Sequence, residues 1–281
     1  MKLKKKSKII IAAVCAFVLA VAVAVPIAVN AFSQSKIEKY LNEDIKNAGG
    51  IRIIADSGET DELKNTVAGF KETVRRGADG VRVDLCFNTD GIPVCTDDYS
   101  AADSAVPLED FFKAMKEDGF TEIKLYLNII QLSKMTQLNR LATEYELLDR
   151  LYLVGIDKNH YGLITSDDTI VPFYLTYEPE NECDGKEAYE LTNEYGASGV
   201  VISSANASAE SIDSLRDFSV PFCVQTDSDE EFCSAALDGA EKIFVSDAQS
   251  ARGILDRWIK AMQKRNASSV EDYLNSFAAD T

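Results

Sequence analysis

Residues 77–98 read GADGVRVDLCFNTDGIPVCTDD. The apolar run over Gly80–Phe87 predicts a strand, and the Asp-Gly pair that follows predicts a tight hairpin into a second strand over Ile92–Thr96. Two adjacent carboxylates, Asp97 and Asp98, come directly after this second strand. The stretch therefore predicts two paired strands with acidic side chains at one end of the sheet.

The same kind of apolar run recurs on both sides of this stretch and alternates with amphipathic helical segments. This alternation is typical of βα units around a parallel sheet. The predicted strands are Ile51–Ala55, Gly80–Phe87, Ile92–Thr96, Ile123–Ile129, Leu151–Ile156, Pro172–Thr176, Gly199–Ile202, Pro221–Thr226 and Lys242–Val245.

The chain of 281 residues, 46% of them hydrophobic, is large enough to bury one sizeable core. We predict an α/β fold, a (β/α)8 TIM-type barrel over residues 50–265. A helix over residues 34–49 precedes it and a tail over 266–281 follows it. One predicted helix starts at the N-cap Ser228 and ends before Gly239, and the last one covers Ser250–Lys264.

Residues 1–33 form a basic tip and an apolar segment. Five of the first eight residues are lysines, and no charged residue occurs from Ile9 to Val29, which is long enough to cross a bilayer. Lysines before an apolar segment favour a cytoplasmic N-terminus, so we predict a single-pass transmembrane anchor in the cell membrane with the barrel outside. The alternative is a cleaved signal peptide, with Val29 and Ala31 before Ser33, and a secreted protein.

The formal net charge is −17, although the five lysines lie in the anchor. The exported part is therefore strongly acidic, and such a surface repels nucleic acid and anionic lipid headgroups. We expect no nucleic-acid partner. The N-terminal helix is the expected membrane contact, and the sequence leaves any other ligand or protein partner unidentified.

Cys15 lies in the apolar segment, and the other cysteines lie outside it, where disulfides can persist. Cys86 and Cys95 flank the hairpin, and a two-residue turn would place them directly opposite each other. A disulfide between them is one reading. Two small apolar strand residues are the other. The remaining cysteines are Cys183, Cys223 and Cys233.

A (β/α) barrel places its functional groups at the C-terminal ends of its strands. Acidic residues dominate these positions, and a rim of carboxylates suits a hard cation such as calcium, although an Asp after a strand is also a common helix N-cap. The strand-end positions are Ala55, Asp56, Asp84, Asp97, Asp98, Asn128, Asp157, Thr226, Asp227, Ser246 and Asp247.

Several motifs occur in a fixed order through the first half of the chain. They are Asn65-Thr66, Phe70, Gly77-Ala78-Asp79-Gly80-Val81, Asp84, Thr89-Asp90-Gly91-Ile92-Pro93-Val94 and Asp98. In this order and spacing the chain resembles the glycerophosphodiester phosphodiesterase family, and weaker likeness extends the match over residues 50–256. The resemblance implies a (β/α) barrel, a divalent cation at its mouth, and cleavage of glycerophosphodiesters to an alcohol and glycerol 3-phosphate.

The family's two catalytic histidines are missing. Their positions fall at Ala55 and Asp97 by this resemblance, and the whole chain has a single histidine, His160. General acid and general base are two roles that need two groups. The resemblance therefore predicts no catalytic residue in this chain.

The implied metal site is reduced as well. The family's Glu-x-Asp pair reads Arg82-Val83-Asp84, its later glutamate falls at Asn128, and the glutamate before the Asn-Thr pair is Lys64. Asp84 is the remaining candidate ligand, so we expect no cofactor unless a calcium or magnesium site survives. Arg82 can instead pair with nearby carboxylates. The predicted pocket rim consists of Asp56, Arg82, Asp97, Asp98 and Asn128.

Three functions stay open. The first is a non-catalytic, membrane-anchored relative of the phosphodiesterases, a pseudoenzyme that serves binding or interaction. The second is an active metal-dependent phosphodiesterase whose site is rearranged among Asp56, Asp84, Asp97 and Asp98. The third is a glycosidase-like barrel that works through paired carboxylates.

Overall fold

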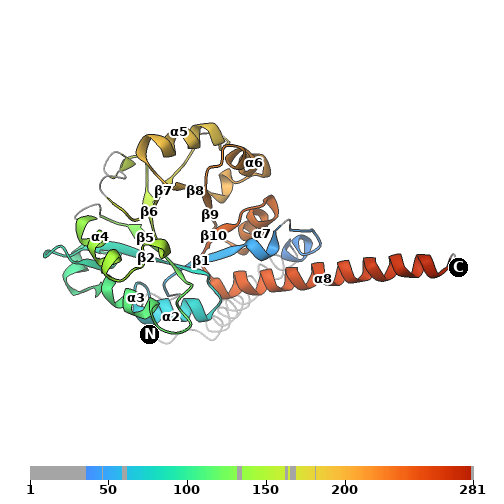
Figure 1. Ribbon diagram of the computed structural model, residues 1–281, viewed down its shortest axis with the longest axis horizontal. Helices are drawn as coiled ribbons and strands as arrows, with labels where there is room; N and C mark the ends of the chain where they lie inside the picture. The colour runs from blue at the N-terminus through green and yellow to red at the C-terminus, as the bar shows by residue number, and fades with distance from the viewer. Residues whose placement is uncertain are drawn as a thin grey trace, which may run out of the picture.

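Eight parallel strands close into a barrel in the computed structural model (Figure 1). The structure describes residues 36–45, 47–58, 62–131, 135–161, 164, 169–180 and 182–279. The strands follow one another around the barrel in chain order, and β1 closes it by pairing with both β2 and β10. They are β1 (Arg52–Asp56), β2 (Gly80–Phe87), β5 (Lys124–Ile129), β6 (Leu151–Ile156), β7 (Phe173–Thr176), β8 (Gly199–Ser203), β9 (Phe222–Gln225) and β10 (Lys242–Val245).

The TIM-type barrel is thus confirmed, and each strand predicted from the sequence is found. The helices around it are α2 (Val67–Arg75), α3 (Leu108–Met115), α4 (Met135–Glu144), α5 (Gly185–Tyr195), α6 (Ala209–Asp217), α7 (Asp229–Asp238) and α8 (Ala248–Ala279). After β6 the described residues form turns in place of an α-helix. The predicted ends of α7 are confirmed, because the Ser228 side chain accepts a hydrogen bond from the Glu231 amide and Gly239 has a φ of 110°.

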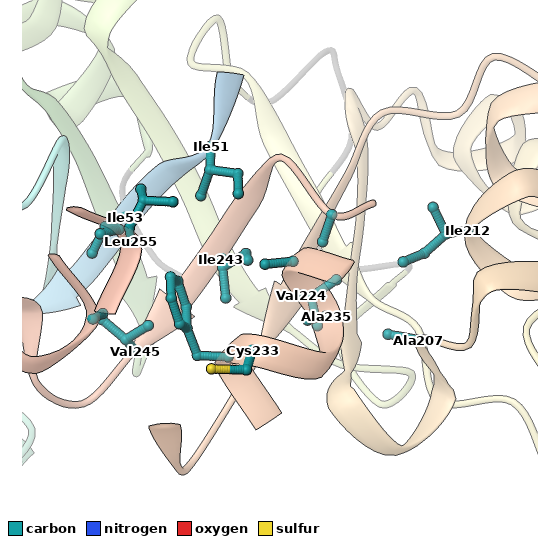
Figure 2. Packing of buried hydrophobic residues seen from close by; sticks show 14 of the residues in the cluster. Ile51, Ile53, Ala207, Ile212, Val224, Cys233, Ala235, Ile243, Val245 and Leu255 are labelled. Atoms are coloured by element: carbon teal, nitrogen blue, oxygen red, sulfur yellow. The ribbon is translucent and has the colours of Figure 1, made fainter. Parts of the chain in front are cut away.

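Alternation along the strands divides the core into an inner and an outer layer. Ile53 and Val245 point outward and pack with Leu255 of α8 and Cys233 of α7 (Figure 2). The neighbouring positions point inward and fill the barrel. These inner residues are Ile54, Tyr126, Val154, Tyr174, Val201, Cys223 and Phe244.

The segment before β1 packs on α8. Residues 36–40 are helical, and Ile37 and Leu41 are buried in the outer layer. The Trp258 indole donates a 2.8 Å hydrogen bond to the Glu43 carbonyl, and Arg265 donates one of 2.9 Å to the Leu41 carbonyl. The two ends of the barrel domain therefore support each other.

The sequence predicts an anchor over residues 1–33 and a tail from residue 266. α8 runs unbroken to Ala279, across the predicted start of a tail at residue 266. No helix within the described ranges is long and apolar enough to span a membrane. The predicted anchor over residues 1–33 lies outside those ranges.

A short antiparallel excursion follows β2. It consists of the predicted strand β3 (Pro93–Cys95), a 3-10 helix η2 (Tyr99–Ser104) and a second short strand, β4 (Val106–Pro107). Of these strands, only β4 was not predicted from the sequence. The Asn88 amide donates to the Ile92 carbonyl, so the turn has three residues, 89–91, and Gly91 takes a φ of 79°. The extra residue, compared with a two-residue turn, shifts the pairing of the strands by one.

This shift excludes the disulfide, which was one of the two readings of Cys86 and Cys95. Cys95 pairs with Leu85 and Cys86 pairs with Val94, so the two cysteines lie on opposite faces of the hairpin. Cys95 packs in the outer core, and Cys86 packs in a small separate cluster with Val94 and Ala102. Both are free thiols, in accordance with the alternative reading as small apolar strand residues.

Candidate functional site

Arg82 organises the centre of the barrel mouth, the end at which the parallel strands finish. Its Nε lies 2.6 Å from Asp56 Oδ1 and its Nη2 lies 3.1 Å from Asp56 Oδ2, while Nη1 donates to Gln225 Oε1 at 2.7 Å. The guanidinium also lies 5.2 Å from the centroid of the Phe244 ring. This forked, stacked arrangement suits the planar guanidinium and uses three of its N–H donors.

The residue that β1 presents to the mouth is Asp56, not Ala55. Ala55 is 1% exposed and packs in the outer layer with Ile51 and Ile53, whereas Ile54 points into the barrel. A histidine at position 55 would therefore point away from the mouth. Of these two neighbouring residues, only Asp56, a predicted member of the pocket rim, therefore faces the mouth.

Asp84 lies in a second group beside the first. Its Oδ1 accepts a 2.6 Å hydrogen bond from Asn128 Nδ2, and its Oδ2 accepts one of 2.9 Å from Asn65 Nδ2. Asn65 Oδ1 in turn accepts the Asp84 amide at 2.8 Å, which fixes the orientation of the Asn65 side chain. The carboxylate of Asp84 thus faces N–H donors on both oxygens.

Lys64 joins Asp84 to Asp97. Its ammonium nitrogen lies 2.6 Å from Asp97 Oδ2 and 3.5 Å from Asp84 Oδ2. The hydrogen bond from Lys64 lowers the pKa of Asp97, and the same bond raises the pKa of Lys64. Because both side chains of the Lys64–Asp97 pair are about half exposed, the pair itself is worth at most about 1 kcal/mol. What matters more for function is that a fixed positive charge lies between two carboxylates.

The donor set around these carboxylates does not fit the divalent cation that the resemblance implies. Calcium and magnesium bind oxygen lone pairs, and here the carboxylate oxygens face the amide or ammonium hydrogens of Lys64, Asn65 and Asn128. Turning the Asn65 amide to offer its oxygen would leave the buried Asp84 amide without its acceptor. Within the described part of the chain, no group of three His, Cys, Asp or Glu side chains is placed to hold a metal ion.

Two cavities in the described part of the chain adjoin these charged side chains. The first, which we name the mouth cavity, has a volume of about 230 Å³, with a polar rim above an apolar base. The second, the hairpin cavity, has about 410 Å³ and lies between the loop of Lys64 and the β3–β4 excursion. Residues lining the mouth cavity include Arg82, Asn128, Thr176, Glu178, Ser203, Gln225, Val154, Val201 and Phe244.

The other predicted residues lie apart from these groups. Asp98 caps η2, accepting the Ser100 amide at 2.8 Å, and lines neither cavity. His160 follows β6 and lies 2.7 Å from Asp157 on the surface, 47% exposed. Both therefore have local structural partners.

Sequence reasoning missed three contributors to the mouth. The sequence marks Lys64 only as the replacement of a glutamate, and its contact with Asp97 depends on the fold of two loops. Asn65 belongs to a motif that does not indicate its bond to Asp84, and its backbone takes an unusual φ of 55°. Gln225 lies at the C-terminal end of a predicted strand, so its position alone was a usable signal.

No protein-family model matches the chain, and no curated protein matches its sequence. Solved structures do match. A protein from Galdieria sulphuraria assigned to the glycerophosphodiester phosphodiesterases has a TM-score of 0.59 and 15% identity, over 73% of this chain and 98% of that chain. The glycerophosphodiester phosphodiesterase from Agrobacterium tumefaciens has a TM-score of 0.58 and 14% identity, over 73% and 98%. One from Parabacteroides distasonis has a TM-score of 0.55 and 15% identity, over 74% and 97%.

The structural similarity shows the fold, but at 14–15% identity it does not show the activity, which has to be argued from the residues themselves. Nearly the whole length of each solved relative is matched. The chain therefore shares the barrel fold of the glycerophosphodiester phosphodiesterases.

Proposed function

We propose that this chain is a non-catalytic member of that fold group, which binds a ligand or partner at the mouth of its barrel. The observation that carries the proposal is the placement of two internal cations on the mouth carboxylates. Lys64 lies between Asp84 and Asp97, and Arg82 forms a forked pair with Asp56. Catalysis in the family that the sequence resembles needs a bound divalent cation, a general acid and a general base at the same place.

Phosphodiester cleavage requires stabilisation of the phosphoryl oxygens and two proton transfers. Arg82 already donates to Asp56 and Gln225, and Lys64 donates to Asp97. The single histidine of the chain pairs with Asp157 on a surface loop. Because both mouth cations are paired with carboxylates, their charge is largely compensated, and a phosphodiester would meet an acidic rim.

The mouth cavity supports a binding role for a small, uncharged, polar ligand. Thr176 and Ser203 bring hydroxyl groups to its rim, and Val201 and Phe244 form its apolar base. A few convergent polar groups above apolar walls are typical of small-molecule sites. Because Arg82 is neutralised by Asp56 while Glu178 is exposed at the rim, an anionic ligand is disfavoured there.

The N-terminal lysines and the uncharged segment Ile9–Val29 indicate where the protein is located in the cell. We propose that this segment anchors the chain in the cell membrane and that the barrel lies outside. Protease added to intact cells should then digest the barrel, and it should be protected if the orientation is reversed. A chain that is released by high salt or found free in the medium would point to the secreted alternative.

The enzymatic question is tested with the purified full-length chain and glycerophosphocholine in the presence of calcium, magnesium or manganese. We expect no turnover above the rate without protein. Metal-dependent turnover that disappears in Asp84→Ala would overturn the proposal in favour of the rearranged phosphodiesterase. Hydrolysis of nitrophenyl glycosides that disappears in Asp56→Asn or Asp97→Asn would favour the glycosidase-like alternative.

A further inference from the structure

The opposite end of the barrel contains a cavity of about 470 Å³, which we name the floor cavity. Arg52, Gly80, Lys124 and Lys242 line it, and each is the first residue of its strand. Because the barrel strands are parallel, these residues meet at the N-terminal ends of the strands, away from the mouth. The active sites of TIM-type barrels lie at the other end, so the charged residues at this end call for a separate explanation.

Two of these cations are direct neighbours. Arg52 and Lys242 are paired in the register of β1 and β10, and each lies on the same face of its strand as the inward-pointing residue two positions further on, Ile54 or Phe244. Within the described residues, no carboxylate lies within 4.0 Å of either cation. Lys242 donates to the Tyr174 hydroxyl at 3.2 Å, while Arg52 reaches only backbone carbonyls.

The other charges of the floor cavity do not balance this pair. Lys124 adds a third cation, whose ammonium donates to the Asp149 carbonyl at 2.8 Å. Of the two carboxylates that line the cavity, Asp79 is engaged by Arg252 at 2.7 Å and by the Ile53 amide at 2.8 Å. The second, Glu122, is exposed. Three cations, exposed at Arg52 and partly buried at Lys124 and Lys242, therefore face one carboxylate that forms no ion pair within the described residues, in a chain whose net charge is −17.

Aromatic side chains form the inner wall of the floor cavity. The rings of Tyr126 and Tyr152 are stacked, with centroids 5.1 Å apart and planes at 21°, and Tyr152 meets Tyr174 edge-on at 5.8 Å. The Tyr126 ring has room because residue 80 is a glycine, where a Cβ would approach the ring to 2.8 Å. The cavity thus combines cations at its rim with flat aromatic surface inside.

We infer that the floor cavity binds a small organic anion with a flat apolar body. The phosphate or carboxylate oxygens would lie between Arg52 and Lys242, where they replace neutral oxygens as partners and relieve the repulsion between the cations. The apolar body would lie against Tyr152. This site is separate from the mouth and does not depend on the proposed function.

Phenyl phosphate is the probe, titrated calorimetrically into the full-length chain at low ionic strength. We expect binding with a Kd in the range of about 10 µM to 1 mM. Arg52→Met and Lys242→Met should each weaken it about tenfold or more, whereas Lys186→Met, an exposed control on α5, should leave it unchanged. Inorganic phosphate and phenol, which each supply half of the recognised chemistry, should both bind more weakly than phenyl phosphate.

Circular dichroism checks that the variants are folded, and Lys242→Arg, which keeps the charge, should retain most of the affinity. Ring signals of labelled tyrosines provide a second readout, and those of Tyr152 should shift on binding. The inference is overturned if the folded wild type shows no binding at about 10 mM probe. It is also overturned if Arg52→Met and Lys242→Met bind as the wild type does, or if inorganic phosphate binds as well as phenyl phosphate.

Discussion

Lys64 and Asp97 form an ion pair across the barrel mouth, with 2.6 Å between ammonium nitrogen and carboxylate oxygen. Lys64 belongs to the loop after β1, and Asp97 follows β3, so the contact ties two loops 33 residues apart. The same ammonium lies 3.5 Å from Asp84. A side chain of the protein thus supplies the positive charge that a bound cation would otherwise bring to these carboxylates.

Replacing Lys64 by methionine should raise the pKa of Asp97 toward its ordinary value, because the hydrogen bond that lowers this pKa is lost. Carbon NMR of the Asp97 carboxyl measures the change. Lys71→Met is the matched control, since it removes an exposed pair with Glu117 away from the mouth. An Asp97 pKa that is equal in wild type and Lys64→Met would contradict the described geometry.

The same pair predicts a pH dependence of stability. The pKa of Asp97 is lower in the folded than in the unfolded chain, so its contribution is fully present above the unfolded value of about 3.9. The contribution is lost as the pH falls through the folded pKa. Urea unfolding should show wild type more stable than Lys64→Met by less than about 1 kcal/mol at pH 6, since the pair is half exposed. A difference that persists undiminished at pH 2 would exclude this origin.

Replacing Arg82 by methionine should destabilise the fold by about 1–2 kcal/mol, because Asp56 and Gln225 lose their shared donor at a half-buried site. Arg82→Lys should recover only part of the loss, since one ammonium cannot form the fork on Asp56. Urea unfolding of the three proteins gives the values. Equal stability of wild type and Arg82→Met would mean that the network contributes nothing to folding.

The hairpin register predicts which cysteines can be joined. Cys86 and Cys95 should both be found as free thiols when the unfolded chain is alkylated without reductant and analysed by mass spectrometry. Val94→Cys, directly opposite Cys86, should instead form a disulfide with Cys86 on mild oxidation. A cross-link between Cys86 and Cys95 in the unmodified chain would refute the three-residue turn.

The segment before β1 should contribute to barrel stability. Leu41 is 7% exposed in the outer core, so Leu41→Ala should cost about 2–4 kcal/mol. Trp258 is the chain's single tryptophan and donates to this segment, so its fluorescence follows the unfolding. Ile170→Ala, at a position 55% exposed, should change stability by less than about 0.5 kcal/mol. A Leu41→Ala effect as small as that control would show that the segment is not part of the fold.

The sequence predicted the barrel well because strand and helix periods are local properties. It failed where one residue decides the face of a side chain. A turn one residue longer than expected separates Cys86 from Cys95, and the alternation of β1 points Asp56 but not Ala55 into the mouth, although both were expected at the strand end. The pair of Arg82 with Asp56 agrees with the expectation that Arg82 pairs with nearby carboxylates. The contact between Lys64 and Asp97 could not be predicted, since it depends on how two loops fold together.

If internal cations hold the mouth carboxylates, the wild-type chain should leave calcium unbound, and a calcium titration measures this. Calorimetry of the full-length chain with calcium chloride should show no saturable binding up to about 1 mM. Lys64→Glu, which replaces the ammonium by a carboxylate beside Asp84 and Asp97, should bind calcium more tightly than the wild type. Saturable binding by the wild type that Asp84→Asn abolishes would contradict the account.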